Sequence, residues 1–206
     1  MKRGIDVSKW QGAMNWDTAA KRVDFAYIKS SQGIFTDAQF ETNYQGATAA
    51  GIPLGFYHFY DPRVNWQLQV EYFTDIIERH PTGLLPAIDL EILTGTTPNP
   101  AHILLFIAAV AEHINALPII YSGPSYILTY LSRFPELGRY PLWIAHYAKN
   151  PRWPLPAPQV PLPWYPFGWT IWQYSADGNG MGSYYGAQSA AIDLDIAWEL
   201  PILSNL

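Results

Sequence analysis

The chain has 206 residues, of which 49% are hydrophobic, and it contains no cysteine. This length and apolar content suit one domain with a substantial core and exclude a disordered chain. The missing cysteines exclude disulfide scaffolds, thiolate metal sites and a cysteine nucleophile. A net charge of −5 without a run of Lys or Arg argues against nucleic-acid binding. Aromatic residues reach 16%, which is typical of an aromatic core or of a groove for an uncharged ligand with apolar faces, such as a sugar.

Short apolar runs, each bounded by Gly, Pro or polar residues, recur along the chain and predict eight β-strands. Several runs are almost continuously apolar, as in strands that are covered on both faces of a parallel sheet. We expect strands at residues 4–8, 25–30, 54–60, 85–91, 118–122, 141–147, 170–174 and 191–196.

Helical patterns separate these strands, at residues 17–23, 38–50, 64–79, 101–116 and 125–134. Gly51 and Pro53 end the second helix, because glycine follows a helix easily and proline cannot continue one. Strands that alternate with helices indicate βα units. Eight of them in 206 residues predict an α/β fold, a (β/α)8-type barrel with mostly parallel strands.

The pattern changes after the sixth strand. Seven prolines fall within residues 151–166, and no helix survives this density because each proline removes an amide donor and clashes with the preceding turn. The glycine-rich residues 177–186 also indicate a loop. We therefore expect an irregular barrel whose last helices are replaced by loops, with residues 1–206 as a single domain. A linker is the alternative interpretation of the proline-rich stretch.

The start of the chain has two basic residues but no apolar stretch after them. Asp6, Ser8 and Lys9 interrupt the place where a signal peptide would be apolar. The longest apolar run, residues 103–111, is about half as long as a membrane-spanning helix. We therefore expect this chain to be made in the cytoplasm without a signal peptide, and we expect no membrane insertion.

Four acidic side chains lie at or near strand ends, where the functional residues of such a barrel gather: Asp6, Asp89, Glu91 and Asp193. Alternation along a strand turns Asp89 and Glu91 to one face, with their Cβ atoms roughly 6–7 Å apart. Carboxylates buried together must share a proton, find a cation or serve a function. A coupled pair has one raised pKa, which is what a general acid requires.

Other interpretations of these acids are weaker. Lys29 is the main basic residue on a strand and is the candidate for a salt bridge to the pair. Divalent metal sites usually add histidines at fixed spacing, but only His58 and His146 lie on predicted strands, and no HxH or HExxH spacing occurs. A lone histidine on a strand is more often a hydrogen-bonded core residue. Ser122 lacks the surroundings of a nucleophile elbow. We expect no metal and no cofactor.

Aromatic side chains gather toward the strand ends, namely Tyr57, Phe59, Tyr121, Trp143, Tyr147, Trp172 and Tyr174. About half of them should belong to the core, because side chains alternate along a strand. We expect the rest to line a groove. Aromatic walls above paired acids suit pyranose rings, and glycoside hydrolysis uses two carboxyl groups that flank the scissile bond.

A series of short motifs follows the predicted strands. They are GIDVS at 4–8, WQG at 10–12, FAYIK at 25–29, GFYHF at 55–59, DLE at 89–91, IYS at 120–122, PLWIA at 141–145, WQYS at 172–175 and IDLD at 192–195. Each motif alone is weak, but their order is specific. In this order they make the chain resemble, over nearly its whole length, the glycoside hydrolase family 25 lysozymes, the Chalaropsis-type N-acetylmuramidases.

The resemblance implies an irregular α/β barrel that cleaves the β-1,4 bond between N-acetylmuramic acid and N-acetylglucosamine in bacterial peptidoglycan. It implies Glu91 as proton donor and Asp89 as the residue that orients the reacting N-acetyl group, with retention through the acetamido oxygen of the substrate. Asp6 and Asp193 match two further active-site acids. The expected substrate-binding residues are Lys29, Tyr57, Tyr121, Trp143, Tyr147, Gln173 and Asp195.

The resemblance also favours a phage or prophage endolysin, because a wall hydrolase without a signal peptide must be released by lysis or through a separate pore. It would then act on the wall after release. A secreted form whose signal has been trimmed is the alternative. We expect a monomer with no separate cell-wall-binding module.

Two positions depart from the family pattern. Ser31-Gln32-Gly33 stands where members usually carry Thr-Glu-Gly, and Asp195 stands where they usually carry Asn. An extra carboxylate near Asp193 should raise the pKa of one of the two. Neither change touches Asp89 or Glu91, so we expect activity. A chitinase-like N-acetylhexosaminidase and a non-catalytic glycan-binding protein are the alternatives.

Overall fold

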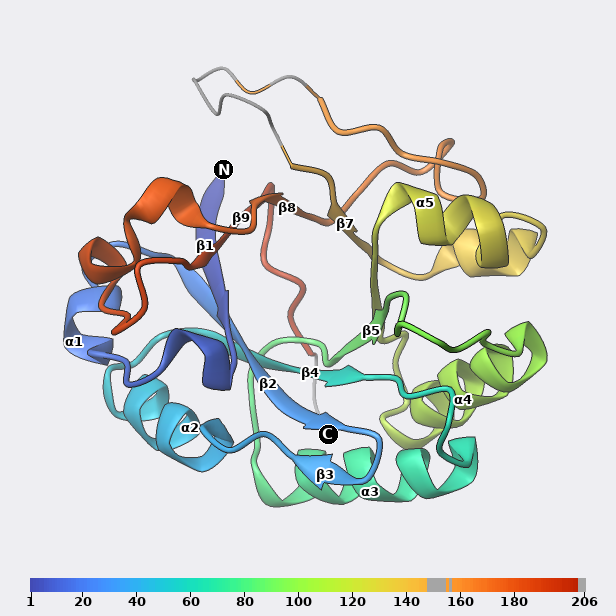
Figure 1. Cartoon of the computed structure of the whole chain (residues 1–206), viewed down its shortest axis with the longest axis horizontal. Coiled ribbons are helices and arrows are strands. Elements are labelled where there is room, and N and C mark those ends of the chain that lie inside the picture. Colours follow the sequence, from blue (N-terminus) through green and yellow to red (C-terminus); the bar gives the residue numbers. More distant parts are fainter. Residues whose placement is uncertain (148–154, 156, 204–206) are drawn as a thin grey trace.

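The computed structural model of the chain describes residues 1–147, 155 and 157–203. Its centre is a closed barrel of eight strands in the order β1-β9-β8-β7-β6-β5-β4-β2, with β1 paired back to β2 (Figure 1). The strands are β1 (Lys2–Val7), β2 (Phe25–Gln32), β4 (Leu54–Phe59), β5 (Ala87–Leu90), β6 (Ile119–Ser122), β7 (Leu142–Ala145), β8 (Ile171–Ser175) and β9 (Asp193–Ala197). The predicted barrel and all eight predicted strands are confirmed.

Seven of the barrel strands run parallel to one another, and β9 runs antiparallel to its two neighbours, β8 and β1. The reason lies in the connection before it. Residues 176–192 contain only two short 3-10 turns, Gly178–Gly180 and Gly182–Tyr185, where a plain loop was predicted. A direct return without a crossover helix produces an antiparallel pair. Asp193 therefore begins β9 rather than ending it, and it still lies at the same rim as Asp6.

The predicted helices are also present, as α1 (Trp16–Ala19), α2 (Phe40–Ala49), α3 (Trp66–Arg79), α4 (Pro100–His113) and α5 (Pro124–Tyr126), which continues as a π-helical turn at Ile127–Leu131. Asparagine side chains cap three of them by accepting backbone N–H groups, and Pro100 occupies the first turn of α4. None of the helices in the described residues is long and apolar enough to cross a bilayer.

Three details differ from or extend the expected pattern. A short strand, β3 (Phe35–Thr36), folds back onto the end of β2 and was not predicted. Two 3-10 helices, Lys9–Gln11 and Pro135–Arg139, also add to the pattern. Between β7 and β8, residues 155 and 157–170 contain no helix, as the prolines predicted. Residues 148–154 and 156 of that proline-rich stretch lie outside the described part of the chain.

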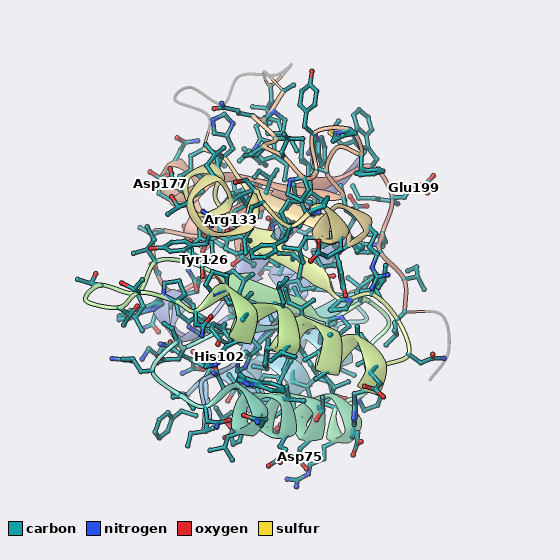
Figure 2. All side chains as sticks on the ribbon, turned by 90° about the vertical axis from the view of Figure 1, so that its right-hand side faces the viewer. Asp75, His102, Tyr126, Arg133, Asp177 and Glu199 are labelled. Atoms are coloured by element: carbon teal, nitrogen blue, oxygen red, sulfur yellow. The ribbon has the colours of Figure 1, made fainter. Side chains whose placement is uncertain are left out.

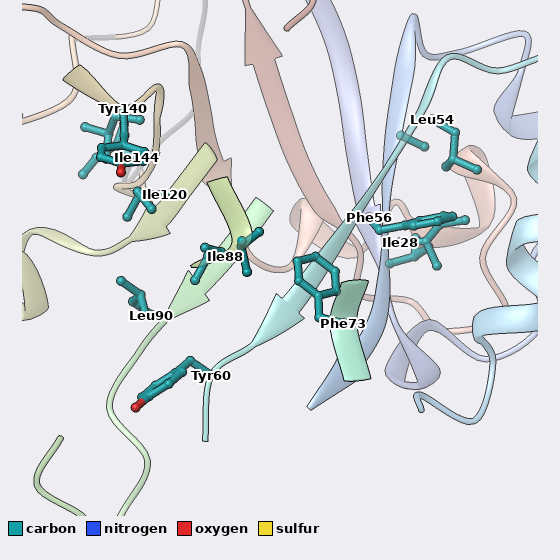
Figure 3. Packing of buried hydrophobic residues seen from close by; sticks show 14 of the residues in the cluster. Ile28, Leu54, Phe56, Tyr60, Phe73, Ile88, Leu90, Ile120, Tyr140 and Ile144 are labelled. Atoms are coloured by element: carbon teal, nitrogen blue, oxygen red, sulfur yellow. The ribbon is translucent and has the colours of Figure 1, made fainter. Parts of the chain in front are cut away.

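The core has two layers. Large side chains such as Phe25, Tyr27 and Trp143 fill the inside of the barrel. A larger layer packs between the strands and the helices and includes Ile88 and Leu90, both fully buried (Figure 3). The outer helix faces carry polar residues such as Asp75 on α3 and His102 on α4 (Figure 2), together with the exposed Leu68 and Leu105. Because Ile88 and Leu90 face the helices, alternation along β5 turns Asp89 toward the barrel axis.

Candidate active site

A cavity of about 240 Å³ opens at the carboxyl ends of the parallel strands. Ten of the eleven predicted site residues line it, namely Asp6, Lys29, Tyr57, Asp89, Glu91, Tyr121, Trp143, Tyr147, Gln173 and Asp193. Asp195 lies beneath it. The cavity is also lined by Ser8, Trp10 and Gln11, which the sequence reasoning did not assign to the site. The sequence could have indicated them, because they directly follow the first strand and functional residues of such a barrel gather at the carboxyl ends of its strands.

The four acids Asp6, Asp89, Glu91 and Asp193, called the acid cluster below, come from three strands. Asp6 and Asp193 are opposite each other on β1 and β9. Asp89 is the third residue of β5, and Glu91 directly follows that strand. Asp6 and Asp89 are only 6% and 5% exposed, whereas Glu91 is half-buried. The fourth acid, Asp193, is half-buried too, so the barrel holds two almost inaccessible acids beside two that a ligand in the cavity can reach.

Burial raises the pKa of every member of the acid cluster, because a carboxylate loses its hydration inside the protein. It raises the pKa of Asp6 to about 7 and that of Asp193 to about 9, and the Glu91 charge adds to both shifts. The Lys29 charge opposes burial at Asp89 and Glu91. The cluster therefore holds protons at neutral pH, as a site with a general acid must.

A hydrogen-bond chain orients one side of the cluster. Gln173 donates from Nε2 to Asp6 Oδ2 at 2.6 Å. Its other end accepts the hydroxyls of Tyr121 at 2.8 Å and Tyr147 at 3.1 Å. These two donors fix the orientation of the amide, so that its N–H group points to Asp6. Gln11 Nε2 donates to Asp193 Oδ2 at 3.3 Å. Both glutamines thus hold acids in place.

Asp195 lies behind the cavity and is 1% exposed. Its Oδ1 accepts the indole N–H of Trp143 at 2.8 Å, and its Oδ2 is buried without a hydrogen-bond partner among the described residues. Burial raises its pKa well above the usual value, and the charges of Asp6 and then Asp193 add to this. The structure thus gives Asp195 contacts with other site residues and no place on the cavity wall, although the resemblance had suggested contact with substrate.

Lys29 makes no salt bridge with the acids. Among the described residues no ion pair includes it, and its Nζ donates to Gln32 Oε1 at 3.1 Å and lies 4.7 Å from the Phe59 ring centroid. Burial lowers its pKa, and the charges of Asp89, Asp37 and Glu91 oppose that shift. The acids are therefore not explained as a salt-bridged structural pair.

The aromatic residues divide between the cavity and the core. Tyr57, Phe59, Tyr121, Trp143 and Tyr147 line the cavity, whereas Trp172 and Tyr174 pack against the outer core layer. Trp143 is 1% exposed and contacts Tyr121 edge-on at 4.9 Å between ring centroids, so it forms the floor. Tyr147 and Trp10 are 50% and 74% exposed and form the rim. Such exposed flat rings suit stacking on a sugar.

The two strand histidines have structural partners. His58 is fully buried, contacts Ser31 Oγ at 2.9 Å and Gln69 Oε1 at 3.2 Å, and burial lowers its pKa to about 3. His146 Nδ1 accepts the backbone N–H of Gln159 at 3.0 Å. Within the described residues, no group of three acids or histidines is arranged to hold a metal ion.

An α/β barrel with acids and aromatic rings at the carboxyl edge of its strands has the architecture of a glycoside hydrolase. Comparison with known proteins defines the family: residues 5–183 match the model of the glycosyl hydrolases family 25, and the chain belongs to this family.

Individual relatives agree with this assignment. Lysozyme M1 of Streptomyces globisporus is 33% identical over 197 residues, which cover 86% of this chain and 63% of that protein. The chain thus spans less than two thirds of the length of this relative. A bacterial lysozyme structure from Streptomyces coelicolor superposes with a TM-score of 0.78 at 29% sequence identity. The match covers 96% of this chain and 92% of the Streptomyces coelicolor chain. A muramidase structure from Acremonium alcalophilum superposes with a TM-score of 0.75 at 25% identity and covers 97% and 94%.

Proposed function

We propose that the protein is a lysozyme that hydrolyses the β-1,4 bond between N-acetylmuramic acid and N-acetylglucosamine in bacterial peptidoglycan. The observation that carries the proposal is the acid cluster at the base of an aromatic-rimmed cavity, in a chain of glycosyl hydrolases family 25. The names of its relatives, lysozyme and muramidase, support the same substrate.

In this mechanism Glu91 is the general acid. It is half-buried, as Asp193 is, and burial raises its pKa, so its carboxyl group holds a proton that the glycosidic oxygen can take as the bond to the leaving sugar breaks. The resulting carboxylate can then remove a proton from the water that completes hydrolysis. One residue thus returns to its starting state after each cycle.

Asp89 assists the N-acetyl group of the sugar whose C1 reacts. Asp89 lines the cavity beside Glu91, and its Oδ1 has no hydrogen-bond partner among the described residues, so the carboxyl group has acceptor capacity left for the N–H of an acetamido group. That hydrogen bond would orient the acetamido oxygen toward C1, where it forms the new bond as the glycosidic bond breaks. Water then opens the cyclic intermediate, and the configuration at C1 is retained.

Replacing the proposed acid tests this assignment. Glu91→Gln should slow the loss of turbidity of a peptidoglycan suspension by about 10²- to 10⁴-fold, because the amide has no proton to give at neutral pH. The control is its thermal unfolding curve, which should match that of the wild type, since a neutral amide replaces a protonated carboxyl group of similar shape. Equal lysis by both proteins would contradict the role of Glu91, and faster release of reducing ends from chitin oligomers than from peptidoglycan would contradict the substrate.

A further inference from the structure

A second cavity, of about 300 Å³, lies beside the first at the rim of the barrel. The two share Lys29, and the second is bounded by the β2–β3 turn, the residues after β4 and the turn after β1. Glu91 is on the other side, where it also borders a third hollow next to Tyr126. The cavities therefore continue one another across the barrel mouth, with the acid cluster between the outer two.

The second cavity contains three basic and two acidic side chains. One acid is already neutralised, because Arg63 contacts Asp61 through Nη2 at 2.6 Å and Nε at 2.9 Å. The other, Asp37, accepts the backbone N–H of Gln39 at 2.9 Å. Lys9 is exposed, and neither Lys9 nor Lys29 has an ion pair with any described residue. Two ammonium groups thus face one carboxylate, that of Asp37, and the cavity keeps a net positive charge for a ligand.

Gln32 contacts Lys29 without neutralising its charge, so the ammonium group keeps its charge for a ligand. The Gln32 side-chain oxygen accepts the Lys29 ammonium at 3.1 Å, and, after the larger effect of Arg63, the Gln32 amide helps to lower the pKa of the Asp61 carboxyl group. A neutral amide can serve both partners, because it carries an acceptor and a donor. A glutamate here would neutralise Lys29 and repel Asp61, which is 4% exposed. The side chain at position 32 therefore sets the net charge of the second cavity.

We infer that the second cavity binds a carboxylate carried by the glycan substrate, with Lys9 and Lys29 as its partners and the exposed Phe35 as an apolar surface beside them. The inference rests on the proposed function, because peptidoglycan differs from a neutral glycan such as chitin in having carboxylates. One source is the lactyl group of N-acetylmuramic acid, and the other is the stem peptide attached to it. The cavity shares Lys29 with the reaction site, so a substituent on a nearby sugar can reach it.

Three soluble oligomers of alternating N-acetylglucosamine and N-acetylmuramic acid test this inference. The first keeps its stem peptides, the second has free lactyl carboxylates, and in the third these carboxyls are reduced to alcohols. We expect kcat/KM for at least one carboxylate form to exceed that of the reduced form about fivefold, the effect of one partly exposed charge contact. The preference should shrink at high salt, because salt screens exposed charges.

Two variants carry the inference, and one serves as a control. Lys9→Met removes an exposed ammonium group, and Gln32→Glu neutralises Lys29 without removing it. Each variant should lower the ratio of kcat/KM between the carboxylate and the reduced oligomers to about one. Lys21→Met removes the same charge from an exposed position that does not line the cavity, and it should keep the wild-type preference. Preference for the free lactyl form identifies that group as the ligand, and preference for the stem-bearing form alone identifies the peptide.

Binding of the same oligomers to Glu91→Gln, measured by calorimetry, separates this inference from the proposed activity. Failure of the wild type to cleave any oligomer contradicts the activity. Equal affinity of Glu91→Gln for the three oligomers overturns the carboxylate site, as does a preference that survives in both Lys9→Met and Gln32→Glu.

Discussion

At the scale of single residues, Asp195 shows how a buried acid can act as a neutral group. It accepts a hydrogen bond from Trp143 through Oδ1, and its Oδ2 is buried without a partner among the described residues. Burial raises the pKa of Asp195 well above its usual value, and the charge of Asp6 adds to this, so the Asp195 carboxyl group stays protonated. It then offers one acceptor and one donor, as an asparagine would.

Substitution of Asp195 tests this state. Asp195→Asn preserves the acceptor for Trp143 and the neutral state of the side chain, so lytic activity should stay within about twofold of the wild type. Asp195→Leu leaves the buried indole N–H of Trp143 without its partner and should lower the free energy of unfolding by about 1–3 kcal/mol and reduce activity. Turbidity assays and urea titrations measure the two effects. A large activity loss in Asp195→Asn would show that the site needs a charged carboxylate there.

At the scale of elements, neighbouring strands fit because glycines face aromatic rings inside the barrel. Gly4 on β1 is in register with Phe25 on β2, and Gly55 on β4 is in register with Tyr27. A Cβ atom at either glycine would overlap the facing ring. The Tyr27 hydroxyl also donates to the Leu85 carbonyl at 2.9 Å, which prevents the ring from turning away. These pairs allow two large rings to fill a narrow barrel.

Alanine at these positions should therefore destabilise the barrel. Gly4→Ala and Gly55→Ala should each lower the free energy of unfolding by about 1–3 kcal/mol, because a well-packed interior cannot accept another methyl group without strain. Gly83→Ala is the matched control, since its Cβ would meet nothing within 4 Å. Urea titrations followed by tryptophan fluorescence measure the three values. Similar stabilities for all three variants would contradict this account.

At the scale of the whole molecule, the barrel gathers more carboxyl groups than it can ionise. The pKa of Asp6 is about 7 and that of Asp193 about 9 in the folded chain, well above the usual value near 3.8, with burial as the largest cause. Each holds its proton to a higher pH in the folded than in the unfolded chain. The stabilisation from this proton is complete below about pH 4 and is lost as pH rises through the folded value.

Stability should consequently fall between pH 7 and pH 9.5. Above pH 7 His58 no longer contributes to the pH dependence of stability, because it is neutral in both the folded and the unfolded chain. Lys29 has a lowered pKa in the folded chain, so its own contribution to stability increases as the pH rises and opposes this fall. We expect the Tm of the wild type to fall by at least about 3 °C across this range, and that of Asp193→Asn to fall less. Parallel Tm curves for the two proteins would contradict the raised pKa of Asp193.

Most of the architecture follows from local sequence patterns. Apolar runs bounded by Gly and Pro place all eight barrel strands, and helical spacing places the helices between them. The acid cluster was also visible in the sequence, because charged residues such as Asp89 between aliphatic neighbours contradict a plain core strand. The short β3 escaped prediction because two residues carry no period, and its pairing depends on the turn after β2.

The sequence by itself determined the barrel, its family motifs and the acids at its mouth, because strand alternation and side-chain chemistry are local properties. Only the tertiary structure decided that β9 is antiparallel and still brings Asp193 opposite Asp6. It also decided that Asp195 lies behind Trp143 and that Lys29 contacts Gln32 instead of an acid. These outcomes depend on how deeply a side chain is buried and on contacts between segments that are far apart in the chain. Local sequence patterns carry no information about either.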